Sequence, residues 1–267
     1  MVGIGFFGIV ELFVIPLIIV LVPIFIGQYF GIYLSKKSPD LPRESVSTAV
    51  GAAFALLAFM LAFTFQIAAD RYNTRKELLL TEVTNIRTTY LRAGLLPEPF
   101  RTDTKKLLVE YTDIRADFAN DVSKIDVLLS RSPEILKSLW DCTESLAEMD
   151  RSSEVYALFT QSVNDLYENY NQRITMSLEY RIPAIILWIL FIIAFISMLA
   201  LGYQFGISGK GSFGINLLLG IVFAVVMFLI LALDRPETGI ARLNQKPVIA
   251  LQKQLHDLQL DVKPTKL

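Results

Sequence analysis

One predicted helical face carries the residues best suited to conducting ions. Its members follow one another at intervals of four, three, four and seven residues: Phe59, Phe63, Gln66, Asp70 and Glu77. At 100° per residue, these side chains fall within about 60° of one another around a helix. Apolar side chains can form a constriction that gates by dewetting, and rings of acidic side chains attract cations. The spacing predicts a pore lined by the first four residues, with Glu77 in a cytoplasmic vestibule.

The aromatic pair Phe59 and Phe63 also has a second interpretation, because aromatic side chains at helical spacing often pack inside a bundle or face lipid. Gln66 and Asp70 favour the pore, since polar groups at membrane depth usually face protein or water rather than lipid. A row of small residues, Gly51, Ala55, Ala58 and Ala62, lies about a quarter-turn away and would let another helix approach closely.

Two Asp-Arg pairs follow apolar stretches of the chain, Asp70-Arg71 and Asp234-Arg235. One interpretation is an interfacial ion pair that ties helix ends together, because arginine commonly extends from a membrane helix to the water interface. The other interpretation is that one member faces an ion path. Both interpretations stay open at the level of the sequence.

Residues for catalysis or metal binding are sparse. The chain has a single cysteine, Cys142, and a single histidine, His256, which are far apart in the sequence. We find no glycine-rich phosphate loop, no nucleophile elbow and no spacing typical of metal ligands. The net charge of −1 gives no general attraction to nucleic acid. We therefore expect no enzymatic activity, catalytic residue, metal site, cofactor or nucleic-acid partner.

Four long stretches without any charged residue dominate the chain. They run between Glu11 and Lys36, Glu44 and Asp70, Arg181 and Lys210, and Lys210 and Asp234. Each is long enough for the roughly 20 apolar residues with which a helix crosses a bilayer. A spanning segment must satisfy its own backbone hydrogen bonds, which favours helices. We predict four transmembrane helices near residues 12–34, 47–69, 182–203 and 215–233.

Nearly all the charge lies between the second and third of these stretches, although only 19% of all residues are charged. Helical spacing of apolar residues there predicts a four-helix antiparallel bundle whose outer helices continue the second and third spans. Its third helix is expected to begin at Ser132-Pro133-Glu134. The expected fold is an all-α membrane protein with a cytoplasmic helical-bundle insert. Its parts are two spans (1–69), the insert (70–181), two spans (182–234) and a cytoplasmic tail (235–267).

The distribution of basic residues predicts the topology. With four spans, the insert and both termini lie on one side of the membrane. That side carries about twice as many lysines and arginines near the membrane ends as the opposite side, which places it in the cytoplasm. The N-terminal segment has no basic region typical of a cleaved signal, and its apolar run is too long for one. We expect a multi-pass protein of the cell inner membrane.

Several strings resemble the bacterial bestrophin-like family over about Ser45 to Leu255. They include LLAFMLAFTFQIAADRYNTRKELLLTE (56–82), LGYQFGISGK (201–210) and LALDRPETGIARLNQKPVIALQ (231–252). The resemblance implies a multi-pass membrane protein with a cytoplasmic helical domain. It also implies kinship to pentameric chloride channels whose second span carries aromatic residues at a neck. The acidic Asp70 and Glu77 would fit cations at least as well as chloride.

We therefore expect a homo-oligomeric channel for small inorganic ions, with the second span lining the pore. Four spans leave little room for a pore within one protomer, so a ring is expected, and the resemblance favours a pentamer. The alternative is a non-conducting, membrane-anchored interaction or sensor protein that acts through its cytoplasmic bundle. A secondary transporter is disfavoured, because the sequence has no inverted repeat and no pair of broken helices.

Overall fold

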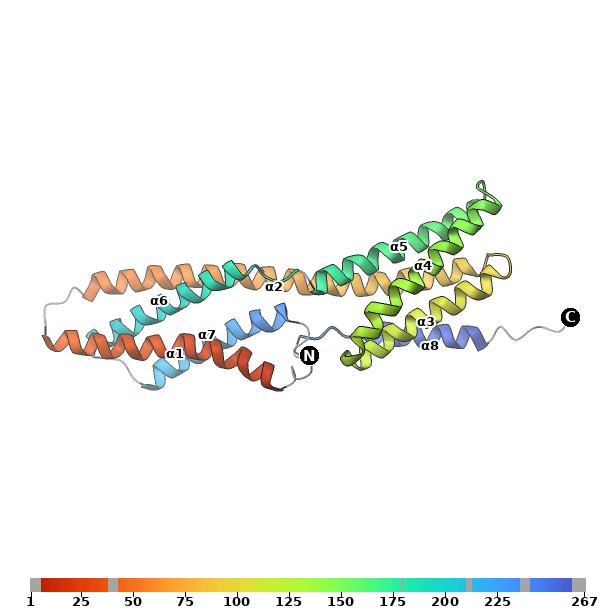
Figure 1. Ribbon diagram of the computed structural model, residues 1–267. Coiled ribbons are helices and arrows are strands. Elements are labelled where there is room, and N and C mark those ends of the chain that lie inside the picture. The colour runs from red at the N-terminus through yellow and green to blue at the C-terminus, as the bar shows by residue number, and fades with distance from the viewer. Residues whose placement is uncertain (1–5, 38–42, 179, 210–212, 236–240, 261–267) are drawn as a thin grey trace. The chain divides into compact units, whose positions relative to one another are not determined.

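The computed structural model describes residues 6–37, 43–178, 180–209, 213–235 and 241–260, and the regular structure in these ranges is entirely helical (Figure 1). The helices are α1 (Phe6–Lys37), α2 (Arg43–Ala93), α3 (Phe100–Asn120), the short 3-10 helix η1 (Val122–Lys124), α4 (Ile125–Met149), α5 (Glu154–Leu178), α6 (Ala184–Ser208), α7 (Phe213–Asp234) and α8 (Lys246–Leu260). The middle parts of the two expected connections, residues 38–42 and 210–212, and residues 236–240 and 261–267 lie outside these ranges.

Four of the helices are long and apolar enough to cross a membrane: α1, α2, α6 and α7. They coincide with the four uncharged stretches, so the described residues confirm a helical fold with four helices of the length and composition that a membrane span requires. Helix α6 extends five residues beyond the predicted end of the third span at 203, to Ser208. Helix α1 keeps Pro16 and Pro23 within a single continuous helix.

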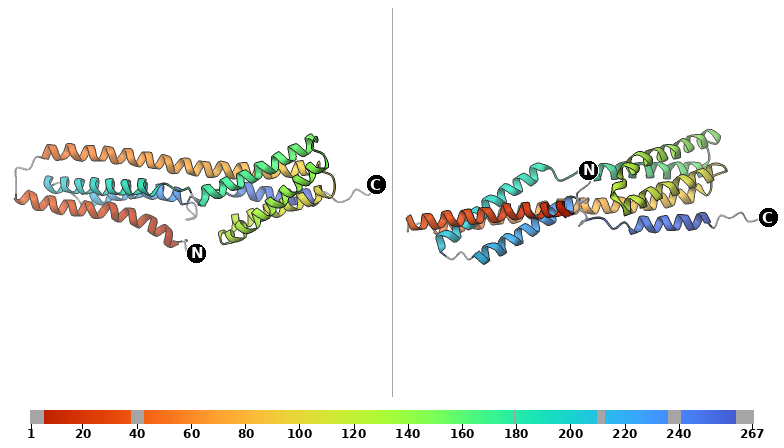
Figure 2. Two further views of the ribbon diagram at one scale, coloured as in Figure 1. Left: turned by 45° about the horizontal axis from the view of Figure 1, so that its top comes forward. Right: turned by 60° about the horizontal axis from the view of Figure 1, so that its bottom comes forward.

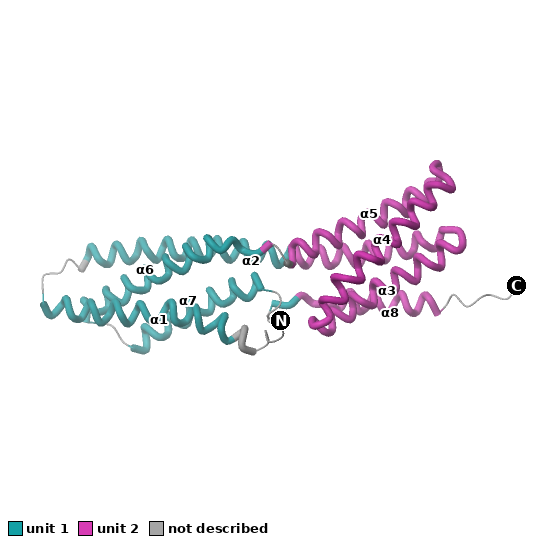
Figure 3. Tube along the Cα trace, viewed as in Figure 1, with its two compact units in different colours: residues 1–73, 181–242 teal, residues 74–180, 243–267 magenta. Residues whose placement is uncertain are grey.

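The chain divides into two compact units (Figure 3). The membrane unit comprises residues 1–73 and 181–242, and the extramembrane unit comprises residues 74–180 and 243–267. Helix α2 contributes its first part to the membrane unit and its last turns to the extramembrane unit. Each unit has its own hydrophobic cluster, and each is described separately below.

Two sequence predictions about the helices of the polar part need correction. Helix α5 ends at Leu178 and α6 begins at Ala184, so the fourth insert helix does not continue into the third span. Proline at 183 lacks an amide hydrogen and marks the start of a new helix. Helix α4 begins at Ile125, about two turns before the expected start at Ser132, and contains Pro133. The predicted tail contributes α8 to the extramembrane unit.

The membrane unit is organised around a close crossing of α1 and α6. A Cβ atom built on Gly27 would overlap the carbonyl oxygen of Leu199, and one built on Gly202 would overlap the carbonyl oxygen of Ile24. Gly31 and Gly206 face each other in the same way one turn further along. Two Gly-x-x-x-Gly pairs thus let the backbones touch, as small residues do at membrane helix interfaces.

Helices α2 and α7 complete the membrane unit around this crossing. Leu57 and Leu61 of α2 join α1, α6 and α7 in one buried cluster. The rings of Phe54 and Phe223 meet edge to face, with centroids 5.5 Å apart. The side-chain amide of Asn216 in α7 donates to Oε1 of Gln28 in α1 at 2.5 Å. Such interhelical hydrogen bonds add to the packing between membrane helices.

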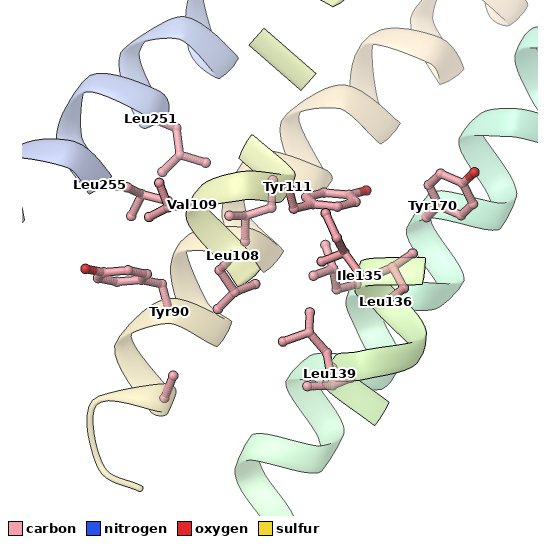
Figure 4. Packing of buried hydrophobic residues seen from close by; sticks show 14 of the residues in the cluster. Tyr90, Leu108, Val109, Tyr111, Ile135, Leu136, Leu139, Tyr170, Leu251 and Leu255 are labelled. Atoms are coloured by element: carbon pink, nitrogen blue, oxygen red, sulfur yellow. The ribbon is translucent and has the colours of Figure 1, made fainter. Parts of the chain in front are cut away.

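The extramembrane unit has the apolar core of a water-soluble bundle. Its buried residues come from α2, α3, α4, α5 and α8, and Figure 4 shows Tyr111 of α3 beside Ile135 of α4. Helix α8 runs along α3 in all the views of Figures 1 and 2. Leu251 and Leu255 of α8 point toward Val109 of α3 (Figure 4). The apolar stripe of the predicted tail therefore completes this core.

Candidate pore-lining face of α2

The membrane part of α2 is the least covered of the four candidate spans. Only 17% of its most apolar window is buried inside the protomer, compared with 28–39% for α1, α6 and α7. The covered side carries Leu57, Leu61, Thr64 and Ala68. The hydroxyl of Thr64 donates to the carbonyl oxygen of Met60 at 2.7 Å, so this buried polar group is satisfied within the helix. Most of the other residues in this window are exposed within the protomer.

The predicted pore-lining residues lie on this uncovered side. Phe59 is 65% exposed and Phe63 is 49% exposed. Their rings lie nearly parallel, at 11°, with centroids 6.4 Å apart. Exposed Gln66 donates a hydrogen bond from Nε2 to Oδ1 of exposed Asp70 at 2.8 Å. One strip of helix surface therefore changes from aromatic to amide to carboxylate over the twelve residues 59–70.

The row of small residues beside this strip is also exposed within the protomer. Gly51, Ala55, Ala58 and Ala62 are all exposed, and a Cβ atom on Gly51 would meet nothing within 4 Å. By contrast, a Cβ atom on Gly27 or Gly202 would overlap the backbone of the opposing helix. Within the protomer, the exposed row of Gly51, Ala55, Ala58 and Ala62 is therefore not the packed side of α2.

The two Asp-Arg pairs have different surroundings. Asp234 is buried, and its Oδ1 accepts a hydrogen bond from the backbone N–H of Ile182 at 2.9 Å. It therefore joins the end of α7 to the residues just before α6, while Arg235 is exposed. Asp70 is exposed and bonded to Gln66, and Arg71 is partly buried. Of the two aspartates, Asp70 is the one on the uncovered face of α2.

Glu77, expected in the vestibule, belongs to the part of α2 in the extramembrane unit and is exposed there. Sequence analysis did not single out its neighbour Glu82, which is buried. Oε1 of Glu82 accepts from the hydroxyl of Tyr111 at 2.9 Å, and both carboxylate oxygens lie 3.2 Å from Nε of Arg115. Arg173 of α5 forms a further ion pair with Oε2.

The sequence contained only a weak sign of this Glu82 cluster, which consists of Glu82, Tyr111, Arg115 and Arg173. Glu82 follows the buried Leu79 by three residues and precedes the buried Ile86 by four, which puts a carboxylate on an apolar helix face. Burial raises the pKa of Tyr111 well above its usual value, and the nearby Arg115 partly opposes the shift. The phenol is therefore a hydrogen-bond donor to Glu82 at neutral pH.

Sites for chemistry do not gather in the described part of the chain. Its histidine, cysteine, aspartate and glutamate residues form no group of three that would hold a metal ion. Cys142 is partly buried, and its sulfur lies 3.5 Å from the hydroxyl oxygen of Thr104. The pKa of its thiol is raised by burial, which makes it a poor nucleophile at neutral pH. His256 contacts Asp113 at 2.8 Å on the surface of the extramembrane unit.

Comparison with known proteins identifies similar sequences and folds. The family model of the bestrophin-like domain matches residues 18–248. A crystal structure of a variant of a bacterial bestrophin homologue from Klebsiella pneumoniae is similar at a TM-score of 0.65 and 14% identity, covering 94% of this chain and 98% of that one. Another variant of that homologue has a TM-score of 0.61 and 16% identity, with 97% and 99% covered.

A structure described as a membrane protein has a TM-score of 0.63 and 16% identity, with 97% of this chain and 100% of that one covered. No curated protein matches the sequence. The shared fold thus extends over nearly the full length of both chains.

Proposed function

Because the chain belongs to the bestrophin-like family, we propose that it is an ion channel of the cell membrane in which several copies form a ring and line the pore with α2. The observation that carries this proposal is the uncovered face of α2. It presents Phe59, Phe63, Gln66 and Asp70 away from the protomer, on the helix least covered by its neighbours. Family membership also favours a role in ion transport over an enzymatic one.

In this proposal, Phe59 and Phe63 form the narrow part of the pore. Apolar rings around a narrow axis exclude water when closed and thus block ions. Gln66 and Asp70 follow toward the cytoplasmic end, where their polar groups can contact hydrated ions. The hydrogen bond between them holds Asp70 in one orientation along the helix. Glu77 would extend the acidic surface into the vestibule.

Ring formation is supported by the unfilled space beside Gly51 and the exposed alanines of α2. Small residues at a membrane helix surface allow a second backbone to approach closely. We favour five copies, by analogy with the pentameric channels that the family name implies. Native mass spectrometry or particle images of the detergent-solubilised protein would count them. A monomer under all mild conditions would exclude this pore.

Ion flux into proteoliposomes tests the pore itself. Phe63→Ala removes a large apolar side chain from the constriction, so it should hydrate the pore and raise ion flux several-fold over wild type. Phe195→Ala is the matched control, since Phe195 is an exposed aromatic residue on α6 rather than α2. Equal flux in wild type and both variants, at background level, would favour the non-conducting interaction protein instead.

Asp70→Asn tests the role of the carboxylate. It keeps the size of the side chain and removes one negative charge from each subunit. We expect the cation-to-anion permeability ratio to fall while flux persists, because charge rings set the local ion concentration. The reversal potential under a salt gradient measures this ratio. An unchanged reversal potential would place Asp70 outside the conduction path.

We further propose that the extramembrane unit and both termini lie on the cytoplasmic side of the inner membrane. The excess of basic residues on that side supports this orientation. In a Cys142→Ser background, Lys106→Cys should be protected from an impermeant thiol reagent in intact cells, and Lys37→Cys should react. Both positions are exposed in the protomer, so the opposite pattern would invert the topology.

A further inference from the structure

The Glu82 cluster in the extramembrane unit carries more positive than negative charge. Arg115 and Arg173 both contact the single carboxylate of Glu82, and Tyr111 adds a neutral hydroxyl. Within the described chain, no second acidic side chain pairs with either guanidinium. The ion pairs therefore leave one positive charge without a partner.

This excess charge lies away from water. The exposed fractions of the side chains are 1% for Glu82, 5% for Arg115 and 14% for Arg173. A buried charge without a counter-charge is costly, because the interior replaces little of its hydration. Burial lowers the pKa of Arg115, and it lowers the pKa of Arg173 to about 10. Both guanidinium groups nevertheless keep their charge at neutral pH.

Hydrogen-bond donors also outnumber acceptors at the cluster. A guanidinium has five N–H groups, and Arg115 uses only its Nε toward Glu82. Cζ of Arg115 lies 5.9 Å from the centroid of the Phe118 ring. The ring stabilises the charge weakly but offers no hydrogen-bond acceptor. Within the described chain, Nη1 of Arg173 is buried and contacts only Oε2 of the same carboxylate.

We propose that a small monovalent anion, such as chloride, binds at Arg115 and Arg173 and neutralises this cluster. Both guanidinium groups contact the same oxygen, Oε2 of Glu82, so they are close enough for one ion to reach both. The partly exposed Arg173 provides the route of entry. This anion would stabilise the extramembrane unit, and its binding is independent of the pore and of the ions that cross it.

Thermal unfolding in different salts tests the proposal. At equal ionic strength, the apparent Tm of the full-length protein should be about 2–4 °C higher in sodium chloride than in sodium gluconate, whose anion is a much larger organic carboxylate. Arg173→Met removes the excess charge and leaves a neutral pair of Arg115 and Glu82, so its Tm should be the same in both salts. Arg87→Met, which removes an exposed arginine of α2, should respond as wild type does.

Equal Tm values of wild type in the two salts, or a full chloride response in Arg173→Met, would overturn the proposal. A response that depends on protein concentration instead of chloride would assign the counter-charge to a carboxylate of a second copy. If Arg173→Met does not fold, crystals of wild type grown in bromide decide the matter. An anomalous peak beside Arg115 and Arg173 supports the site, and its absence excludes it.

Discussion

The two units of this chain differ in where their large apolar side chains lie. In the membrane unit, large apolar side chains such as Ile18, Trp188 and Leu218 point outward, and glycines lie where α1 and α6 cross. In the extramembrane unit, large apolar side chains such as Leu136 and Phe159 are buried, and the interior also holds the Glu82 cluster. Both units are helical, yet the outer surface of the membrane unit is apolar like the interior of the extramembrane unit.

The difference follows from the solvent of each unit. Lipid is as apolar as leucine, so burying leucine between membrane helices gains little, and close backbone contact through glycine contributes more. In water, burying leucine is the main driving force, and a folded core can then hold a few charges if they are paired. Substitutions of the same kind should therefore have different costs in the two units.

The largest effect is expected for Glu82→Gln in the extramembrane unit. It leaves two buried guanidinium groups without a carboxylate, which should cost about 3–5 kcal/mol. The sole cysteine, Cys142, lies in this unit, and burial raises the pKa of its thiol, so the native protein should react slowly with maleimide. Labelling should accelerate strongly in Glu82→Gln. In Glu77→Gln, which changes an exposed carboxylate on the same helix, it should stay slow.

Leu251→Ala tests whether α8 contributes to the core as other bundle helices do. Leu251 is fully buried against the extramembrane core, so truncation should lower its stability by about 2–4 kcal/mol. Leu258→Ala, on the exposed side of the same helix, should cost much less. Urea-dependent labelling of Cys142 measures both. Equal midpoints for the two variants would mean that α8 packs only loosely on α3.

Gly202→Ala tests the membrane unit. The added methyl group would overlap the carbonyl oxygen of Ile24, so α1 and α6 must separate, at a cost of about 1–3 kcal/mol. Gly51→Ala adds the same methyl group where nothing lies within 4 Å and should leave the protomer fold intact. Thermal aggregation in detergent reports the difference. Because the change lies in the membrane unit, labelling of Cys142 in Gly202→Ala should remain slow below the transition.

The smallest effect is expected at the surface contact between α8 and α3. His256 and Gln252 each contact Oδ1 of Asp113 at 2.8 Å, and His256 and Asp113 are both substantially exposed. His256→Ala should therefore change stability by about 0–1 kcal/mol. Asp113→Ala removes both contacts and should cost more than His256→Ala. A loss in His256→Ala comparable to that in Leu251→Ala would show that the polar contact, rather than the apolar stripe, holds α8.

Features that depend on one segment at a time were predictable from the sequence. Four uncharged stretches of at least 20 residues have no stable place in water, so α1, α2, α6 and α7 followed from length and composition. Helical periodicity also identified the α2 face that carries Phe59 and Phe63. The Gly-x-x-x-Gly spacings at 27/31 and 202/206, where α1 and α6 cross, are also present in the sequence. Helix boundaries were harder to predict. Pro133 has the sequence context of a helix start, but it lies inside α4, which begins at Ile125.

Only the tertiary structure showed which segments pack against each other. An apolar stripe on a short tail shows that it needs a partner but not which one, and the contacts of Leu251 assign it to α3. Glu82, Arg115 and Arg173 are separated by long stretches of sequence, and each alone looks like an ordinary helix charge. Their meeting depends on the arrangement of three helices, because ion pairs in a folded core are set by distances in space. For the same reason, the structure rather than the sequence revealed that α2 keeps its aromatic face uncovered.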